Sequence, residues 1–322
     1  EFLHTKNILK RRKQMTFLPY LLLILGFIFL IKGADLFVDG SSSIAKHMKI
    51  PSVIVGLTIV AMGTSAPEAS VSITAALAGN SDISLGNIVG SNIFNFLVVI
   101  GVSAMIFPII SHKDIIKRDL WWNLGITGLL LLLILDNKLG RLDGIILLLG
   151  MAIYLFVVIR NALKNRTTED NEQLLSVPKS ILFMVIGLAA IIIGGNFVVD
   201  NASIIAKSLG LSETLIGLTI VAIGTSLPEL VTSITAAKKQ EAGIALGNAV
   251  GSNIFNILFI LGASSALTPM NVAPELFIDT ILLIIVGIII FIFAYTGRKT
   301  NRTEGIICVL LYVAYTAYII MR

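Results

Sequence analysis

The chain carries the stretch GLTIVAMGTSAPE at residues 56–68 and repeats it at residues 217–229 as GLTIVAIGTSLPE. A second stretch, GNIVGSNIFN at residues 86–95, returns at residues 247–256 as GNAVGSNIFN. Every equivalent pair is 161 residues apart, and about 29 of the 46 positions from Gly56 to Gly101 are identical in the two copies, without a gap. The duplication divides the chain into two related halves.

The composition predicts a membrane protein. Hydrophobic residues make up 56% of the chain and charged residues only 13%, whereas a soluble domain carries about 25% charged residues. The mean hydropathy is +0.94, and apolar stretches of roughly 18 to 25 residues recur, each long enough to cross about 30 Å of bilayer. The basic residues lie between these stretches, so the lipid bilayer and not nucleic acid is the expected partner.

We expect ten transmembrane helices, with boundaries at about 17–39, 51–77, 83–108, 119–136, 142–160, 180–201, 212–237, 244–267, 275–295 and 304–321. The one long polar connection divides them into a first five-helix repeat (15–160), a linker (161–179) and a second five-helix repeat (180–322). Because five is odd, the second repeat enters the bilayer from the opposite side. The predicted fold is therefore all-α, with two inverted repeats that meet around a site at the bilayer midplane.

Lysine and arginine predict the orientation, because cytoplasmic loops carry an excess of both. Counted over the loops, they place the linker 161–179 in the cytoplasm and both termini outside the cell, in the cell membrane. The basic tail of residues 1–14 favours the opposite orientation. We give it less weight, because we expect it to be a fused or upstream extension.

The segment before Glu68 predicts a cation site. Pro67 has no N–H, so carbonyls one turn earlier, at Gly63 and Thr64, are expected to lose their helical partners. Within a membrane such carbonyls are tolerated only where they line a cavity or meet a ligand. Together with two hydroxyls and a carboxylate they form an all-oxygen set, which suits hard cations such as Ca²⁺ or Na⁺. The second copy offers the same set from Gly224 to Glu229.

The partner segments place Asn87, Ser91 and Asn95 four residues apart, along one face of a helix. Small and amide side chains of this kind also serve as helix-packing residues, and for any one of them that alternative stays open. Duplication of the whole set with a glutamate in each half favours an ion pathway.

Glu68 and Glu229 are the two acidic residues that we place deep in the bilayer. One Ca²⁺ cancels both charges, and so do Na⁺ ions or protons that replace it. A site with a charge of about −2 does not hold Ca²⁺ and several Na⁺ together. Competition for the same carboxylates is a physical basis for exchange.

The paired GTS(A/L)PE and GNxxGSNxxN segments resemble the two repeats of the calcium/cation antiporter superfamily, in particular prokaryotic sodium/calcium exchangers. The resemblance implies that Glu68 and Glu229 ligate Ca²⁺ together with the main-chain oxygens of Thr64 and Thr225. It also implies that Na⁺ uses, besides the glutamates, Ala61, Ser65, Ser91, Ala222, Ser226 and Ser252, with Asn95 and Asn256 flanking the central position.

The chain departs from the family pattern at one position, because some members carry an aspartate where Asn256 stands. This leaves the Na⁺ stoichiometry and the role of protons open. The resemblance also implies that spans 1 and 6 (Leu18–Asp39 and Ser180–Asp200) slide across the remaining helices.

The function predicted from the sequence is a secondary active antiporter that exchanges Ca²⁺ for Na⁺ by alternating access. We expect it to be a monomer without a cofactor, since Ca²⁺ and Na⁺ are its substrates. Coupling to H⁺ or K⁺ on the same scaffold and a cation channel are the alternatives. Neither a nucleophile–base set nor a histidine metal motif is evident, so an enzyme is not expected.

Overall fold

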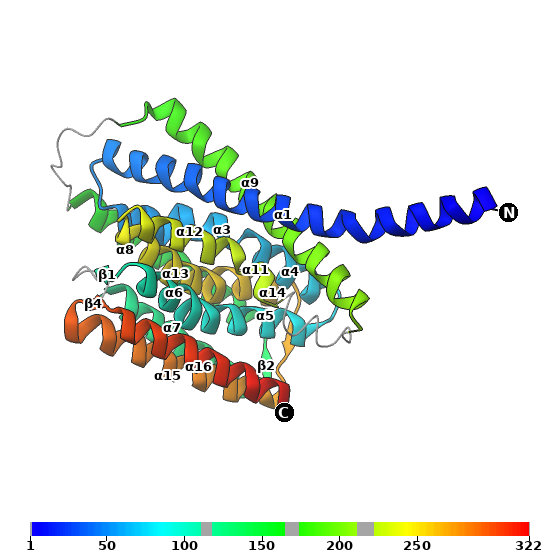
Figure 1. The fold of residues 1–322 in the computed structure, drawn as a ribbon. Coiled ribbons are helices and arrows are strands. Elements are labelled where there is room, and N and C mark those ends of the chain that lie inside the picture. The colour runs from blue at the N-terminus through cyan, green and yellow to red at the C-terminus, as the bar shows by residue number, and fades with distance from the viewer. Residues whose placement is uncertain (1, 111–117, 165–173, 211–221, 322) are drawn as a thin grey trace.

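The computed structural model describes residues 2–110, 118–164, 174–210 and 222–321. Its long helices lie side by side in one bundle (Figure 1). Helices satisfy every backbone N–H and C=O within the segment, which a bilayer demands. Seven described helices are long and apolar enough to span a membrane, or eight if a bent pair is counted as one span. The predicted all-helical, multi-pass character is confirmed.

The first half contains, in order, α1 (Phe2–His47), α2 (Ser52–Val55), the π-helical turn η1 (Gly56–Val60), α3 (Ala61–Thr64), α4 (Ala66–Leu77), α5 (Ser81–Phe94), the π-helical turn η2 (Asn95–Val99), α6 (Ile100–Ile106), β1 (Ile109–Ile110), α7 (Leu120–Leu133), β2 (Lys138–Leu139) and α8 (Arg141–Lys164).

The second half contains α9 (Val177–Ser208), α11 (Ala222–Thr225), α12 (Leu227–Lys238), α13 (Ala242–Phe255), the π-helical turn η5 (Asn256–Leu261), α14 (Gly262–Leu267), β3 (Met270–Asn271), α15 (Pro274–Gly297), β4 (Lys299–Thr300) and α16 (Arg302–Met321). Residues 212–221 of the predicted seventh span lie outside the described residues.

Two predicted boundaries are wrong. The first and sixth spans were expected to end near Asp39 and Asp200, but α1 continues to His47 and α9 to Ser208. In α1 the added turns are polar, yet the serines at 41–43 are buried against the protein. Hydropathy falls where a helix leaves the lipid, whereas the helix itself continues as long as it can pack.

The helices α1 and α9 pack against each other in antiparallel directions through glycines. A Cβ atom added at Gly26 would lie 2.9 Å from the carbonyl oxygen of Gly194, and one added at Gly33 would lie 2.8 Å from that of Gly187. Gly26 and Gly187 are equivalent across the 161-residue offset, and so are Gly33 and Gly194. Gly26 therefore contacts the equivalent of Gly33, and Gly33 contacts the equivalent of Gly26. Surfaces related by a twofold axis meet in this way.

The short strands repeat this reciprocity. β1 pairs with β4 and β2 pairs with β3, both antiparallel, with Ile109 opposite Thr300 and Leu139 opposite Met270. The offset of 161 converts the first pair into the second. The β1–β4 and β2–β3 pairs lie at opposite ends of the bundle (Figure 1). Each half thus contributes one strand to either end.

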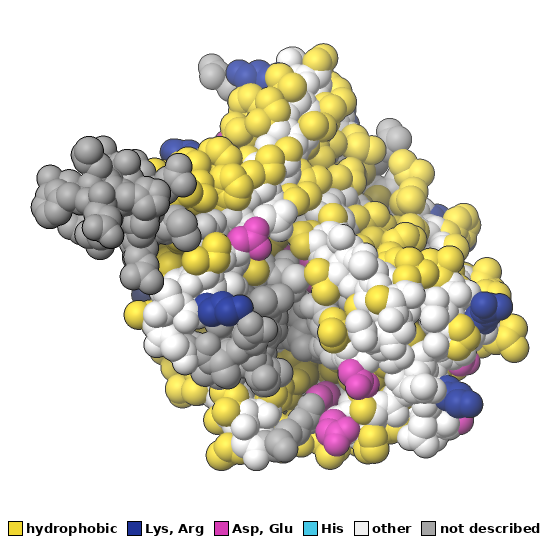
Figure 2. Space-filling view, turned by 90° about the vertical axis from the view of Figure 1, so that its right-hand side faces the viewer, with side chains coloured by type: hydrophobic (Ala, Val, Ile, Leu, Met, Phe, Trp, Pro, Cys, Tyr) yellow, Lys and Arg dark blue, Asp and Glu magenta, His cyan; other side chains and the backbone are white. Residues whose placement is uncertain are grey.

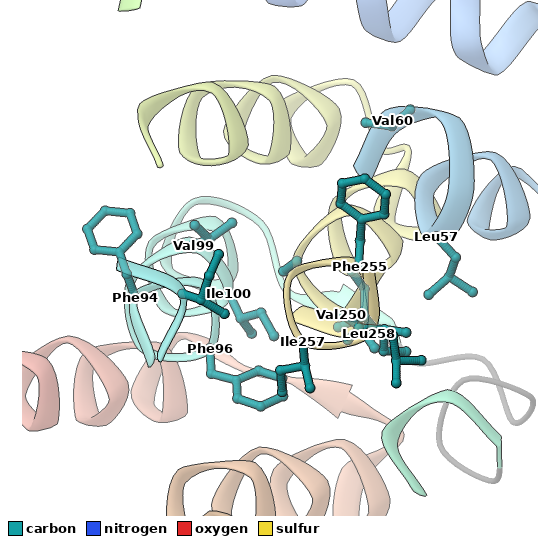
Figure 3. Close-up of a cluster of buried hydrophobic side chains, with 14 of the residues drawn as sticks. Leu57, Val60, Phe94, Phe96, Val99, Ile100, Val250, Phe255, Ile257 and Leu258 are labelled. Carbon is teal, nitrogen blue, oxygen red and sulfur yellow. The ribbon is translucent and has the colours of Figure 1, made fainter. Parts of the chain in front are cut away.

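Apolar side chains cover much of the outside and also fill the centre. Seen from the end of the bundle at which β2 lies, hydrophobic side chains cover much of the upper part and the flanks (Figure 2). Exposed leucine and isoleucine side chains are frequent on α1, α8, α9 and α15, as expected of helices that face lipid. In the centre, Phe96 of η2 and its equivalent Ile257 of η5 are both buried and belong to one apolar cluster (Figure 3).

Gly194→Ala is expected to destabilise the protein by about 1–3 kcal/mol, because the new methyl group overpacks a tight helix contact. Its Cβ would lie 2.7 Å from the Gly26 carbonyl oxygen and 2.8 Å from the Leu30 nitrogen. The matched control is Gly195→Ala, one residue along α9, where the nearest atom is Pro228 Cγ at 3.8 Å. Thermal unfolding in detergent measures both. Equal midpoints would show that the α1–α9 contact tolerates a side chain.

Candidate cation site

The site begins at two breaks in helices. α3 ends at Thr64 and α4 begins at Ala66, with a bend of 49° between the two parts of the span. Pro67 lies in the first turn of α4, where a missing N–H costs least, and Pro228 has the same place in α12. The Gly63 carbonyl, which was expected to lose its partner, accepts a backbone N–H at the end of α3. The break nevertheless directs Glu68 and Glu229 into the protein interior.

Each broken helix binds the glutamate of the other. The Ser65 hydroxyl donates to Oε1 of Glu229 at 2.8 Å, and the Ser226 hydroxyl donates to Oε1 of Glu68 at 2.9 Å. Both carboxyl groups are fully buried. The two halves therefore exchange the same contact in both directions, and the two glutamates, 161 residues apart in the chain, belong to one site.

A second pair of reciprocal hydrogen bonds involves Thr64 and Thr225. Thr64 donates its hydroxyl to Oδ1 of Asn248 at 3.0 Å, and Thr225 donates to Oδ1 of Asn87 at 3.4 Å. The amide nitrogens of the same asparagines donate within their own halves, from Asn87 to Ser72 at 2.9 Å and from Asn248 to Ser233 at 3.0 Å. The amides thus tie each broken helix to its neighbour and to the opposite half.

Four further asparagines connect α5 and η2 with α13 and η5. The amide nitrogens of Asn92 and Asn253 donate to each other's backbone carbonyls, at 3.2 Å and 3.1 Å. Asn95 donates to Oδ1 of Asn253 at 3.1 Å, and Asn256 donates to Oδ1 of Asn92 at 3.0 Å. Because these bonds use the nitrogens, the Oδ1 atoms of Asn95 and Asn256 are left as acceptors.

Ten buried side-chain oxygens have no hydrogen-bond partner among the described residues, and six of them are serine or threonine hydroxyls. The other four, which can only accept, are Oε2 of Glu68, Oε2 of Glu229, Oδ1 of Asn95 and Oδ1 of Asn256. They form two equivalent pairs and come from four different helical segments. A buried acceptor without a donor costs about 1–3 kcal/mol, so each needs an explanation. A cation is the ligand that satisfies several oxygens at once.

The remaining predicted site residues lie around these atoms. The Ser91 and Ser226 hydroxyl oxygens lie 3.1 Å apart, and Ser252 donates to Oε1 of Glu229 at 3.4 Å. The Ser252 hydroxyl also lies 3.5 Å from the main-chain oxygen of Ala61. Ala222 is described only as the first residue of α11. The hydrogen bonds connect the other predicted site residues in three sets. One set contains Glu229 with Ser65, Ser252, Thr64 and Ala61. A second contains Glu68 with Ser226, Ser91 and Thr225. The third joins Asn95 and Asn256 through Asn253 and Asn92.

The sequence interpretation gave no role to Asn92 and Asn253. Both are fully buried, and they set the direction of the amides of Asn95 and Asn256. The available signal was their identity in the two copies of the motif. π-helical turns that begin at Asn95 and Asn256 were also not expected, although such turns are frequent at functional sites.

The donor set fits a hard cation. Oxygen atoms from carboxylates, amides, hydroxyls and a main-chain carbonyl surround the two glutamates, and Ca²⁺ takes six to eight oxygen ligands. Across the described part of the chain, no group of three or more His, Cys, Asp or Glu side chains is placed to hold a metal ion. Neutral oxygens must therefore supply most of the coordination, with two carboxylates providing the charge.

Comparison with known proteins identifies the family. The sodium/calcium exchanger protein family matches residues 18–160 and 179–321, two segments whose starts and ends both differ by 161 residues. The chain is 36% identical to the sodium/calcium exchanger MaX1 of Methanosarcina acetivorans, over 92% of this chain and 97% of that one. It is 35% identical to the inner membrane protein YrbG of Escherichia coli, over 88% and 91% of the two chains.

A solved structure of the sodium-calcium exchanger NCX_Mj, soaked with Na⁺ and Sr²⁺, has a TM-score of 0.84 with this chain at 34% identity. The match covers 94% of this chain and 98% of NCX_Mj. These matches confirm the resemblance drawn from the duplicated motifs. This chain is an integral membrane protein of the sodium/calcium exchanger family, a family of transporters and not of enzymes.

Proposed function

We propose that the protein exchanges Ca²⁺ for Na⁺ across the membrane by alternating access to the site between Glu68 and Glu229. The observation that carries this proposal is the set of four buried carboxylate and amide oxygens without donors, from Glu68, Glu229, Asn95 and Asn256. Two of these are carboxylate oxygens, so one Ca²⁺ neutralises the pair. Na⁺ ions can do the same, and the two cations then compete for the same ligands.

The proposed assignment within the site follows the resemblance to the exchanger family. Ca²⁺ is bound by Glu68 and Glu229 with the main-chain oxygens of Thr64 and Thr225. Na⁺ is bound by the glutamates with the serines at 65, 91, 226 and 252 and the main chain at 61 and 222, and Asn95 and Asn256 flank the centre. The cross-bonds from Ser65 to Glu229 and from Ser226 to Glu68 support a shared site, because they bring both halves to it.

The proposed architecture is ten transmembrane helices in two inverted five-helix repeats, residues 15–160 and 180–322. The antiparallel packing of α1 against α9 supports inversion, because equivalent helices that run in opposite directions cross a membrane in opposite senses. The 14 residues of α7 span less than the usual length. A ten-span count therefore takes α7 as a short span and includes residues 212–221.

The proposed orientation places the linker 161–179 in the cytoplasm and both termini outside the cell, with the protein as a monomer in the cell membrane. The distribution of lysine and arginine over the loops supports this assignment. No cofactor is involved in this scheme, since the cations are substrates.

The test is ⁴⁵Ca²⁺ uptake into proteoliposomes that carry an outward gradient of Na⁺, K⁺ or H⁺, each with the voltage clamped. We expect uptake with the Na⁺ gradient and only background uptake with the other two. Uptake driven by the K⁺ or H⁺ gradient instead would show that K⁺ or H⁺, and not Na⁺, is the coupling ion on the same scaffold. Uptake without any counter-gradient would indicate a channel and contradict exchange.

A further inference from the structure

A charged cluster joins α1 to the turn between α12 and α13, away from the cation site. Lys239, in this turn, donates from Nζ to Oδ1 of Asp39 at 2.7 Å and to the main-chain oxygen of Asp35 at 3.0 Å. Its Nζ also lies 3.6 Å from Oδ1 of Asp35. One lysine thus binds two successive turns of α1.

The same turn makes a second attachment two residues later. Glu241 accepts a hydrogen bond from the Ser42 hydroxyl, and its Oε1 lies 3.8 Å from Nζ of Lys46. The four contacted residues of α1, at 35, 39, 42 and 46, are spaced by three or four positions and so lie along one face of the helix. The turn therefore binds about three turns of α1 with one cation and one anion.

This cluster belongs to one half only. The offset of 161 converts Lys239 into Ala78 and Glu241 into Asn80, whereas Asp39 keeps an acidic equivalent in Asp200. The helix packing also differs between the two halves. α1 packs along α12, whereas the equivalent pair, α9 and α4, makes no comparable contact. The one-sided packing of α1 on α12 thus coincides with the one-sided charge cluster.

We propose that Lys239 and Glu241 form a one-sided latch, which holds α1 against α12 and favours the state in which the site is closed on the side of this turn. The inference rests on the proposed alternating access, because it assigns different stabilities to its two states. α12 carries Glu229 at its first turn and ends at Lys238. A contact at the far end of α12 therefore acts on a helix that supplies the site.

The exposure of the latch limits its strength. The side chain of Lys239 is 29% exposed and that of Asp39 is 48% exposed, and ion pairs of this kind contribute about 0.2–1 kcal/mol each. Each ion pair therefore shifts the ratio of the two states by about 1.4- to fivefold and does not lock either one. A reversible transporter needs such a weak contact, because a strong one would stop the cycle.

The test measures the distance between spin labels in the otherwise full chain, at Ile28→Cys on α1 and Leu132→Cys on α7, with Cys308→Ala as background. Asp39→Asn, which removes one ion pair, should change the ratio of the two distance populations by about 1.4- to fivefold, and Lys239→Ala, which removes two, by about two- to thirtyfold. The matched control Asp200→Asn should leave the ratio unchanged. Ala78→Lys, which offers Asp200 a cation, should shift the ratio in the opposite direction.

Charge exchange separates a latch from simple loss of packing. The triple variant Lys239→Asp with Asp39→Lys and Asp35→Asn should move the ratio back from that of Lys239→Asp alone toward that of the unmodified protein, because it restores the pair at 39 and leaves no like charge at 35. An unchanged ratio in Asp39→Asn, an equal shift in Asp200→Asn, or no restoration by the exchange would each overturn the latch. Na⁺-driven Ca²⁺ uptake by the parent protein is measured in parallel. Its absence would remove the proposed function, whereas normal uptake with an unresponsive ratio would remove the latch alone.

Discussion

Glu68→Gln is expected to abolish Ca²⁺ transport, with a loss of more than a hundredfold, and Glu229→Gln is expected to do the same. Removing one charged partner from a buried interaction costs about 3–5 kcal/mol, which corresponds to at least a hundredfold in binding. The substitution keeps the shape of the side chain and its Oε1 acceptor, so the hydrogen bond from Ser226 to residue 68 can persist. A neutral amide also removes a buried negative charge, so folding should not suffer.

Na⁺-driven ⁴⁵Ca²⁺ uptake in proteoliposomes measures the effect, and thermal unfolding in detergent checks the fold. Glu275→Gln is a suitable control, because Glu275 is an exposed carboxylate in the first turn of α15, outside the site. We expect that control to transport normally. Normal uptake by either site variant would exclude its glutamate from the site, and a difference of more than a few-fold between the two would contradict their equivalence.

Asn256→Asp is expected to lower the Ca²⁺ concentration for half-maximal transport by about tenfold and to slow the maximal rate. A third carboxylate near a divalent ion adds several kcal/mol of attraction at an effective dielectric constant of about 20, most of which is offset by desolvation. The aspartate also loses the amide nitrogen that donates to Oδ1 of Asn92. Tighter binding of Ca²⁺ delays its release, so the two kinetic effects should appear together.

The matched variant is Asn95→Asp, since Asn95 makes the equivalent bond to Asn253. Both variants should tighten Ca²⁺ binding to a similar degree, because the contacts on the two sides are reciprocal. Ca²⁺-dependence of the initial uptake rate, at fixed Na⁺, provides the measurement. An unchanged half-maximal concentration in both variants would place Asn95 and Asn256 outside the coordination sphere.

Much of this site could be predicted because its chemistry stands out in a hydrophobic sequence. Two glutamates and two prolines within apolar stretches specify broken helices and a charged centre, and the 161-residue offset shows that the halves are related. The residues that complete the site were harder to predict. The roles of Asn92 and Asn253 depend on where α5 and α13 cross, since each amide donates to the backbone of the other helix.

Other features have no sequence signal of their own. The polar end of α1 remains helical because Ser41, Ser42 and Ser43 pack against protein, which a hydropathy profile does not record. Lys239 reads as an ordinary loop charge until the structure places it beside Asp35 and Asp39. Such contacts depend on the position of one half relative to the other, which only the folded structure shows.

The reciprocal bonds between the halves have a thermodynamic consequence. Because Ser65 binds Glu229 as Ser226 binds Glu68, an ion bound between the glutamates meets the same ligands whether it arrives from one face of the membrane or the other. Such a centre has no built-in polarity. In any exchanger the direction of net flow is set by the electrochemical potentials of the two cations; in the proposed scheme, reversing those potentials would reverse the flux through the same coordinating atoms.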